Sequence, residues 1–178
     1  MLKFAQTKKH VVRLKGGDPM IFGRGGEEAE YLKNHMIDFE IVPGISSGIG
    51  APIYSGIPLT HRKIASSLAF VTGSENISKT KNINWKKLAG CADTIVIFMG
   101  LSKLDSICKQ FIDGGMNTNM PIAVIQHGTM QNHKTILGTI STISNKIQNL
   151  QVLPPVIIVV GHVVSLAKTI SKRDIYDN

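Results

Sequence analysis

The chain has 178 residues, of which 43% are hydrophobic, and its formal net charge is +8 at pH 7. This size and hydrophobic content are enough for a buried core, so the chain is expected to fold as a globular protein. Its longest apolar runs, such as residues 95–99 and 156–160, fall far short of the roughly 20 residues that a membrane-spanning helix needs. The positive charge indicates an anionic partner, which nucleic acid, a membrane surface or a polycarboxylate small molecule would each provide.

Several common classes of site have no motif in the sequence. Cys91 and Cys108 stand far apart without a Cys-x-x-Cys pair, which argues against zinc and disulfides and favours a reducing, cytoplasmic compartment. No phosphate-binding loop, dinucleotide-binding glycine pattern or nucleophilic serine elbow occurs. The six histidines include no close pair with the spacing of helical metal ligands, so no metal site is expected.

Strand and helix patterns alternate along the chain. Short β-branched runs that stop at a glycine are expected to be strands buried on both faces, at residues 11–16, 40–44, 69–73, 95–100, 124–128 and 157–161. Helical spacing occurs between them, at residues 27–36, 101–112 and 140–150. The alternation predicts an α/β fold with largely parallel sheets, because parallel strands need crossover connections.

The glycines that end these runs indicate where a ligand binds. In open α/β sheets, ligands lie beyond the carboxyl ends of the strands, where a residue without Cβ lets the backbone approach them closely. A tight turn explains any single glycine more simply, whereas the repetition favours a shared ligand crevice.

Residues 56–62 interrupt the pattern with a proline and a polar cluster, which predicts two domains, residues 1–60 and 61–178. The first then holds only two strands, too few for an independent parallel sheet. It is therefore expected to be the carboxyl-terminal part of an α/β domain, followed by a second α/β domain.

The run RLKGGDPMIFGRGGEE, residues 13–28, combines five glycines with an Asp-Pro turn. Asp18 offers a carboxylate for a cationic amino or sulfonium group, although an Asx-turn before Pro19 explains it equally well. Arg24 lies between glycines, where it can bind a carboxylate through two parallel hydrogen bonds or remain a solvated surface side chain. Glu27 and Glu28 fall in the first turn of the next helix, where acidic residues complement the helix dipole.

Together with VPGISSGIGAPIYSGIPLTHR at residues 42–62, this region resembles the signature of the uroporphyrinogen-III C-methyltransferases, within the tetrapyrrole methylase superfamily. Later elements agree in order: Phe98-Met99-Gly100, the His127-Gly128-Thr129 turn and the run from Pro154 to Gly161. The resemblance extends over essentially the whole chain. It implies a fold of two α/β domains with a ligand crevice between them.

The resemblance also implies S-adenosyl-methionine as the cofactor and S-adenosyl-homocysteine as its product. The positions that match the family's cofactor contacts are Gly16, Gly17, Asp18, Ile21, Ser46, Ser47, Met99 and Gly128. Both serines depart from the usual Thr-Ala pair: Ser46 keeps a hydroxyl, whereas Ser47 adds one where a methyl group is common. For Met99, a core methionine at a strand end is the alternative.

Arg24 and Glu27 match polar family positions that face the tetrapyrrole, and we expect Arg24 to hold the substrate and assist its deprotonation. The acetate and propionate groups of that substrate suit a basic protein, with Arg13, Lys15, Arg62 and Lys63 expected near the crevice. The implied reaction converts uroporphyrinogen III to precorrin-2, for sirohaem or cobalamin. The expected enzyme is a cytoplasmic homodimer that acts on a small molecule, without nucleic acid, membrane or metal.

Members of this family begin with a strand, a Gly-x-Gly-Pro-Gly-Asp loop, and an acidic residue and a lysine with proposed acid-base roles. None of these occurs in the sequence, so we expect an amino-terminally truncated and poorly active chain. Two alternatives stay open. An RNA methyltransferase of the same superfamily would suit the charge, although there is no arginine-rich tract and aromatics make up only 6%. A non-catalytic, cofactor-binding remnant is the other.

Overall fold

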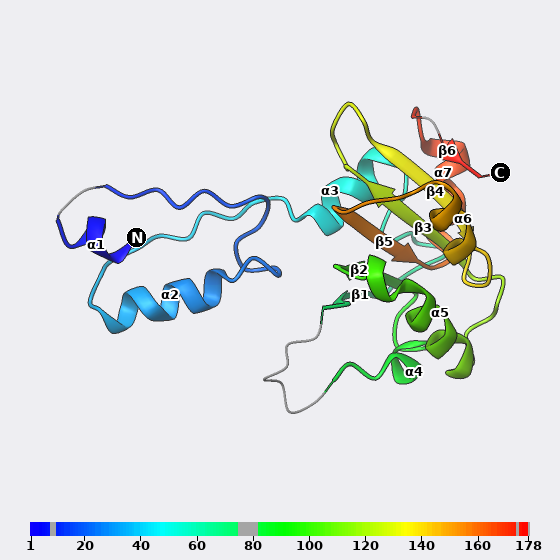
Figure 1. Cartoon of the computed structure of the whole chain (residues 1–178), viewed down its shortest axis with the longest axis horizontal. Helices are drawn as coiled ribbons and strands as arrows, with labels where there is room; N and C mark the ends of the chain where they lie inside the picture. Colours follow the sequence, from blue (N-terminus) through cyan, green and yellow to red (C-terminus); the bar gives the residue numbers. More distant parts are fainter. Residues whose placement is uncertain (8–9, 75–81, 174, 178) are drawn as a thin grey trace. The chain divides into compact units, whose positions relative to one another are not determined.

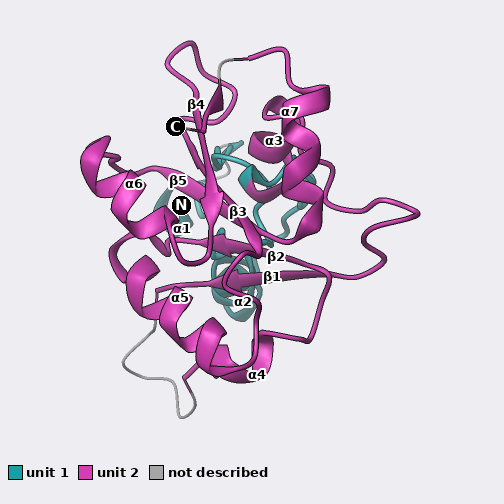
Figure 2. Ribbon diagram, turned by 90° about the vertical axis from the view of Figure 1, so that its right-hand side faces the viewer, with its two compact units in different colours: residues 1–47 teal, residues 48–178 magenta. Residues whose placement is uncertain are grey.

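A computed structural model describes residues 1–7, 10–74, 82–173 and 175–177 (Figure 1). The chain forms two compact units, Met1–Ser47 and Gly48–Asn178 (Figure 2). The boundary between the units lies between Ser47 and Gly48. The division into domains at residues 60 and 61 stays a prediction.

The first unit contains two helices, α1 (Leu2–Ala5) and α2 (Gly25–Asn34), and α2 confirms the helix predicted at residues 27–36. The two strands predicted at residues 11–16 and 40–44 are wrong, because the structure assigns no strand to either run. Val12 and Leu14 are 75% and 82% exposed. An apolar β-branched run needs a neighbouring strand to complete its hydrogen bonds, and no described segment of this unit pairs with either one.

Within the described residues, the second unit is built on a six-stranded sheet in the order β1-β2-β5-β3-β4-β6. Its strands are β1 (Leu68–Thr72), β2 (Thr94–Phe98), β3 (Pro121–Gln126), β4 (Lys134–Thr139), β5 (Val156–Val160) and β6 (Ile175–Tyr176). The four strands predicted in this part of the sequence are confirmed as β1, β2, β3 and β5. β4 and β6 were not predicted from the sequence.

The sheet is mixed, so the prediction of largely parallel strands is wrong for this unit. β1 pairs with β2 and β4 with β6 in parallel, whereas β5 is antiparallel to both β2 and β3, and β3 is antiparallel to β4. Residues 127–133 alone join β3 to β4, and a connection of this kind suffices because antiparallel neighbours need no crossover helix.

Helices cover both faces of the sheet (Figure 2). α5 (Leu104–Asp113), with the short 3-10 helix η1 (Leu101–Lys103) before it, and α6 (Ile143–Asn149) confirm the two helices predicted in this region. The remaining helices are α3 (Ser47–Tyr54), α4 (Trp85–Leu88), η2 (His162–Leu166) and α7 (Ala167–Ile170). Ile95 and Ile97 of β2 join α4, α5 and α6 in the main hydrophobic cluster. Phe98 alternates with them and meets α3 on the other face.

Glycines allow α3 to pack directly on the ends of β2 and β3. A Cβ atom placed on Gly48 of α3 would overlap the ring of Phe98, and one placed on Gly128, just beyond β3, would overlap the Cβ of Ala51. Backbone and ring therefore approach more closely than any side chain at these positions would permit. This contact holds α3 on the ends of the two strands.

We predict that Gly128→Ala destabilises the protein by about 1–3 kcal/mol, because the added methyl group overpacks the contact with Ala51. Chemical denaturation measures the loss. Ala51→Gly is the partner variant, since it removes the atom that the new methyl group would meet. The double variant Ala51→Gly/Gly128→Ala should lose less stability than the two single variants together, and strict additivity would contradict the packing described here.

Candidate functional site

Three strands of the second unit end at the same edge of the sheet. β5 runs antiparallel to both β2 and β3, so β1, β2 and β3 share one direction. Gly73 follows β1, Met99 and Gly100 follow β2, and Gly128 comes two residues after β3. A Cβ atom on Gly73 would lie 2.5 Å from the Cα of Gly100 and 3.0 Å from the carbonyl oxygen of Met99. The structure thus brings Met99 and Gly128 to one edge, as expected of ligand-binding residues in an α/β sheet.

Gly161 does not belong to this edge. It follows β5, which runs in the opposite direction, and a Cβ atom on it would overlap the carbonyl oxygen of Asp93 just before β2. The prediction that all the strand-ending glycines line one crevice is therefore wrong. The sequence pattern carries no information about the direction of each strand.

Left-handed backbone is concentrated where β2 and β3 end. Met99, His127 and Thr129 have φ angles of 53°, 49° and 75°. Non-glycine residues adopt this region at a cost of about 1–3 kcal/mol, and such residues cluster at ligand sites. The side chain of Met99 is 55% exposed, which rules out the alternative of a core methionine.

Asp18 organises the predicted cofactor residues of the first unit. Its Oδ1 accepts hydrogen bonds from the backbone N–H groups of Met20 at 2.8 Å and Ile21 at 3.2 Å, and its Oδ2 accepts one from the N–H of Gly44 at 3.1 Å. The first pair forms the Asx-turn that the sequence offered as an alternative. The third bond joins the loop to the segment that leads to Ser46.

Backbone contacts complete this junction. Gly17 has a φ angle of 125°, and a Cβ atom on it would lie 3.2 Å from the carbonyl oxygen of Ile45. A Cβ atom on Gly44 would lie 2.7 Å from the carbonyl oxygen of Gly17. Gly16, Gly17, Asp18 and Ile21 are thereby held beside Ser46 and Ser47. Ser46 is buried, whereas Ser47 is exposed at the start of α3.

The backbone N–H groups around Asp18 lower the pKa of its carboxyl from the usual 3.8, with Gly44 contributing most, then Met20. Burial opposes this effect, and the hydrogen bond from Ile21 adds to it. Asp18 is therefore an anion at neutral pH, and it places a negative charge within a loop of glycine backbone.

Arg24 and Glu27 lie at the start of α2. Arg24 is left-handed, with a φ angle of 59°, and its Nε atom lies 3.8 Å from Oε1 of Glu27. Their side chains are 82% and 66% exposed, so the ion pair is loose. The glycines on either side are needed, because a Cβ atom on Gly23 or Gly25 would lie 2.5 Å from the carbonyl oxygen of Pro19.

Two of the basic side chains expected near a substrate are already paired. Glu28 accepts a hydrogen bond from Lys15 at 2.8 Å and lies 3.4 Å from Nε of Arg13. The hydrogen bond from Lys15, ahead of its charge and that of Arg13, lowers the pKa of Glu28. This role of Glu28 was not predicted, since its position in the first helical turn indicated only an interaction with the helix dipole. Arg24 is thus the more available cation of the three.

Residues 1–144 match the sequence model of the Tetrapyrrole (Corrin/Porphyrin) Methylases. The chain belongs to this family. It is 48% identical over 167 residues to a uroporphyrinogen-III C-methyltransferase of Priestia megaterium. The aligned region covers 94% of this chain and 70% of the relative. It is 47% identical over 166 residues to a siroheme synthase of Nitrosomonas europaea, of which it spans 35%.

Solved structures of methylases confirm the fold class. A uroporphyrin-III C-methyl transferase of Thermus thermophilus, complexed with S-adenyl homocysteine, matches with a TM-score of 0.79 and 32% identity, over 93% of this chain and 71% of that one. A cobalt precorrin-4 methyltransferase matches with a TM-score of 0.82 at 23% identity, over 92% of this chain and 68% of that one, and supports the fold alone.

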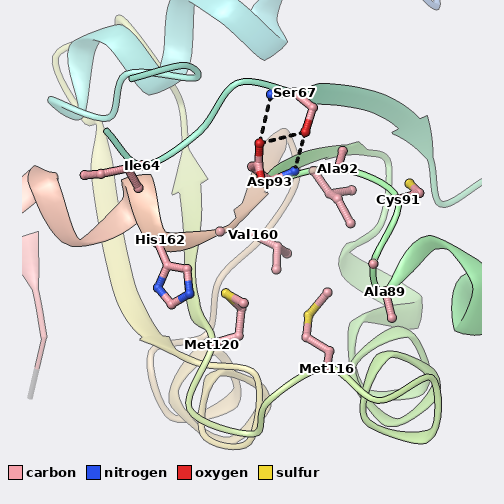
Figure 3. Close-up of a pocket in the computed structure, with 13 residues that line it drawn as sticks. Ile64, Ser67, Ala89, Cys91, Ala92, Asp93, Met116, Met120, Val160 and His162 are labelled. Carbon is pink, nitrogen blue, oxygen red and sulfur yellow. Dashed lines mark hydrogen bonds between the residues drawn. The ribbon is translucent and has the colours of Figure 1, made fainter. Parts of the chain in front are cut away.

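The second unit contains a cavity of about 240 Å³ (Figure 3). Its lining includes Gly161, His162 and Asp93, at the end of β5 and just before β2. Oδ2 of Asp93 accepts hydrogen bonds from the N–H and hydroxyl groups of Ser66 and Ser67, which lower the pKa of its carboxyl to about 2. None of the predicted site residues lines this cavity.

Among the residues that the structure describes, no cluster of three or more His, Cys, Asp or Glu side chains is arranged to hold a metal ion. In the part of the methylase that the structure describes, every helix is too short or too polar to cross a membrane.

We predict that Asp18→Asn and Asp18→Ala separate the two roles of this carboxylate. Asparagine keeps one oxygen for Met20 and Ile21 but turns an amide donor toward the N–H of Gly44, so exchange at Gly44 should accelerate several-fold while the other two stay protected. In Asp18→Ala, all three N–H groups lose their acceptor, so exchange should accelerate at each of them. Amide hydrogen exchange followed by NMR measures each site.

Asp38→Asn is the matched control, because it changes another exposed carboxyl of the same unit. The pKa of Asp18 is lower in the folded state, so its contribution to stability is complete above about pH 3.8 and is lost as the pH falls through the lowered value. Unchanged exchange at Gly44 in Asp18→Asn would contradict the proposed link.

Proposed function

We propose that this methylase transfers methyl groups from S-adenosyl-methionine to carbon atoms of uroporphyrinogen III, giving precorrin-2 for sirohaem or cobalamin and releasing S-adenosyl-homocysteine. The observation that carries the proposal is the 48% identity to the Priestia megaterium enzyme over 94% of the chain. The complex of the Thermus thermophilus relative with S-adenyl homocysteine supports the choice of cofactor.

Two groups of residues fit this cofactor. In the first unit, the glycine backbone at Gly16 and Gly17 can approach a ligand closely, and the ionised Asp18 suits a cationic amino or sulfonium group. Ile21, Ser46 and Ser47 belong to the same junction. In the second unit, Met99 and Gly128 contribute the strand edge on which left-handed backbone is concentrated.

The bound cofactor would supply an activated methyl group, so the contribution of the protein is chiefly alignment of the two reactants. The guanidinium of Arg24 can hold a carboxylate of the substrate through two parallel hydrogen bonds. Glu27 lies beside it and offers a carboxylate that can accept a proton. Arg24 then assists deprotonation of the substrate, because its positive charge stabilises the negative charge left on the substrate when the proton departs.

We further propose that the enzyme works as a homodimer in the cytoplasm, on a small molecule, without nucleic acid or membrane. Cys91 and Cys108 are free thiols, as a reducing compartment would keep them. Burial raises the pKa of Cys108 to about 12, so that this thiol is unreactive at neutral pH.

The experiment that tests the function combines calorimetry with S-adenosyl-homocysteine and transfer of radiolabelled methyl groups. Binding of S-adenosyl-homocysteine, with label transferred to uroporphyrinogen III and not to ribosomal RNA, is the expected result. Label in RNA would replace the proposed substrate, binding without any transfer would make the chain a cofactor-binding remnant, and absence of binding would overturn the proposal.

We predict that Arg24→Ala lowers methyl transfer to uroporphyrinogen III by about tenfold to a hundredfold. A charged hydrogen bond contributes about 1.5–3 kcal/mol, and its loss appears directly in kcat/KM. Stability should not change, because the side chain is 82% exposed. Lys33→Ala removes an exposed cation from the last turn of the same helix and is the control. Equal activity of the two variants would exclude the role of Arg24.

A further inference from the structure

A polar cluster lies inside the second unit, outside the residues assigned to the methyl-transfer site. The hydroxyl of Ser55, directly after α3, is 2.8 Å from the hydroxyl of Thr135 in β4 and 3.2 Å from Nε2 of His133. Nε2 of His133 is also 2.9 Å from the hydroxyl of Thr135. Ser55 and Thr135 are 0% and 1% exposed, so these groups depend on one another for hydrogen bonds.

The protons in this cluster can be assigned one by one. The hydroxyl of Ser55 donates to the carbonyl oxygen of Ala51 at 3.1 Å, so its oxygen acts as an acceptor toward Thr135. The hydroxyl of Thr135 donates to Ser55 and therefore accepts from His133. His133 must then carry a proton on Nε2, which leaves Nδ1 unprotonated in the neutral ring.

Nδ1 of His133 is buried and has no hydrogen-bond partner within the described structure. A lone pair in this position is tolerated more easily than a buried N–H donor without an acceptor. Protonation would place such a donor, together with a positive charge, where no group in the described part of the chain accepts a hydrogen bond from it. Nε2–H can still donate to Thr135 after protonation, but the buried charge and the unpaired Nδ1–H make the folded cluster less stable with the imidazolium than with the neutral ring.

The charged surroundings act in the same direction. The segment after α7 contributes Arg173, whose Nη1 donates to the carbonyl oxygen of Met130 at 3.2 Å and whose guanidinium lies 5.0 Å from the ring centre of Tyr54. Tyr54 ends α3, and Lys134 is the next residue in the chain after His133. Burial and then the charge of Arg173 lower the pKa of His133 from its usual 6.5.

The cluster anchors the carboxyl end of α3 to β4. The same helix begins at Ser47 and packs Ala51 against Gly128, and both Ser47 and Gly128 belong to the proposed cofactor site. Ser55 and Ala51 are one helical turn apart and are joined by a hydrogen bond. Release of Ser55 therefore frees the turn that carries Ala51.

We propose that His133 is a positioning residue: its neutral imidazole holds α3 against the strand edge, and its protonation releases the helix and weakens binding of the adenosyl cofactor. This inference rests on the proposed function for its ligand. It assigns an acid-sensitive element to a side chain that is not among the proposed cofactor-binding residues.

The test follows the affinity for S-adenosyl-homocysteine by calorimetry from about pH 7.5 to about pH 5.5, the range in which histidines titrate. The wild-type protein should lose at least about fivefold in affinity, the lower end of typical couplings between two sites. His133→Gln should bind equally well at the higher pH and lose much less, because its amide can donate to Thr135 and does not titrate. His162→Gln, which removes an exposed histidine elsewhere in the unit, should behave as wild type.

Unfolding measured over the same pH range needs no ligand. Because the pKa of His133 is lower in the folded state, the unfolded chain takes up the proton first, so wild-type stability should fall below about pH 6.5. His133→Gln should lose this part of the dependence, and NMR should find a lowered pKa for the His133 ring.

Equal pH slopes for wild type and His133→Gln, in affinity and in unfolding, would overturn the role of His133. If S-adenosyl-homocysteine fails to bind at any pH, the proposed function fails, and the proposal fails with it as far as the cofactor is concerned. The NMR titration and unfolding then decide separately whether His133 anchors α3.

Discussion

Helix α3 lies against the ends of β2 and β3 at a distance that only glycine permits, and the arrangement of the second unit depends on this contact. Gly48 faces the ring of Phe98, and Gly128 faces the methyl group of Ala51. The strand edge beyond these contacts carries the left-handed residues Met99 and His127. The close packing of α3 thus occurs at the ends of the same strands that carry the strained backbone. Favourable packing of the folded core can offset the free-energy cost of such strain.

The first unit achieves its local order by different means. One carboxylate, Asp18, accepts three backbone hydrogen bonds, and another, Glu28, pairs with Arg13 and Lys15. Both interactions place negative charge within a strongly basic chain. They leave Arg24 as an exposed cation beside the glycine-rich loop, the position from which we propose that it holds a carboxylate of the substrate.

Much of this fold could be predicted from the sequence, because the buried strands and amphipathic helices of the second unit have strong local patterns. β2 and β5 are continuous apolar runs and are buried along their whole length. Their relative direction could not be predicted, since it depends on which strands become neighbours. The same limit explains the failure at Gly161. The runs at residues 11–16 and 40–44 have the composition of strands but lack a described partner, so local pattern alone was misleading there.

The site divides in a similar way. The glycine-rich run and the residues that match the family could be found by motif, and the Asx-turn at Asp18 follows from the Asp-Pro sequence. The bond from Gly44 to Asp18 joins residues 26 positions apart, and the cluster of Ser55, His133 and Thr135 joins residues up to 80 apart. No local pattern signals such contacts, because each depends on the packing of segments that are distant in the chain.

No hydrophobic side chain in the described part of residues 1–47 is buried, and this has a thermodynamic consequence. Loss of order in that unit would expose little new apolar surface, so it would produce a small heat-capacity change and a shallow dependence on urea. Because its contacts are largely ionic and polar, added salt would loosen it more readily than the sheet of the second unit. Salt would therefore act mainly on the order of the first unit, and urea mainly on the sheet of the second.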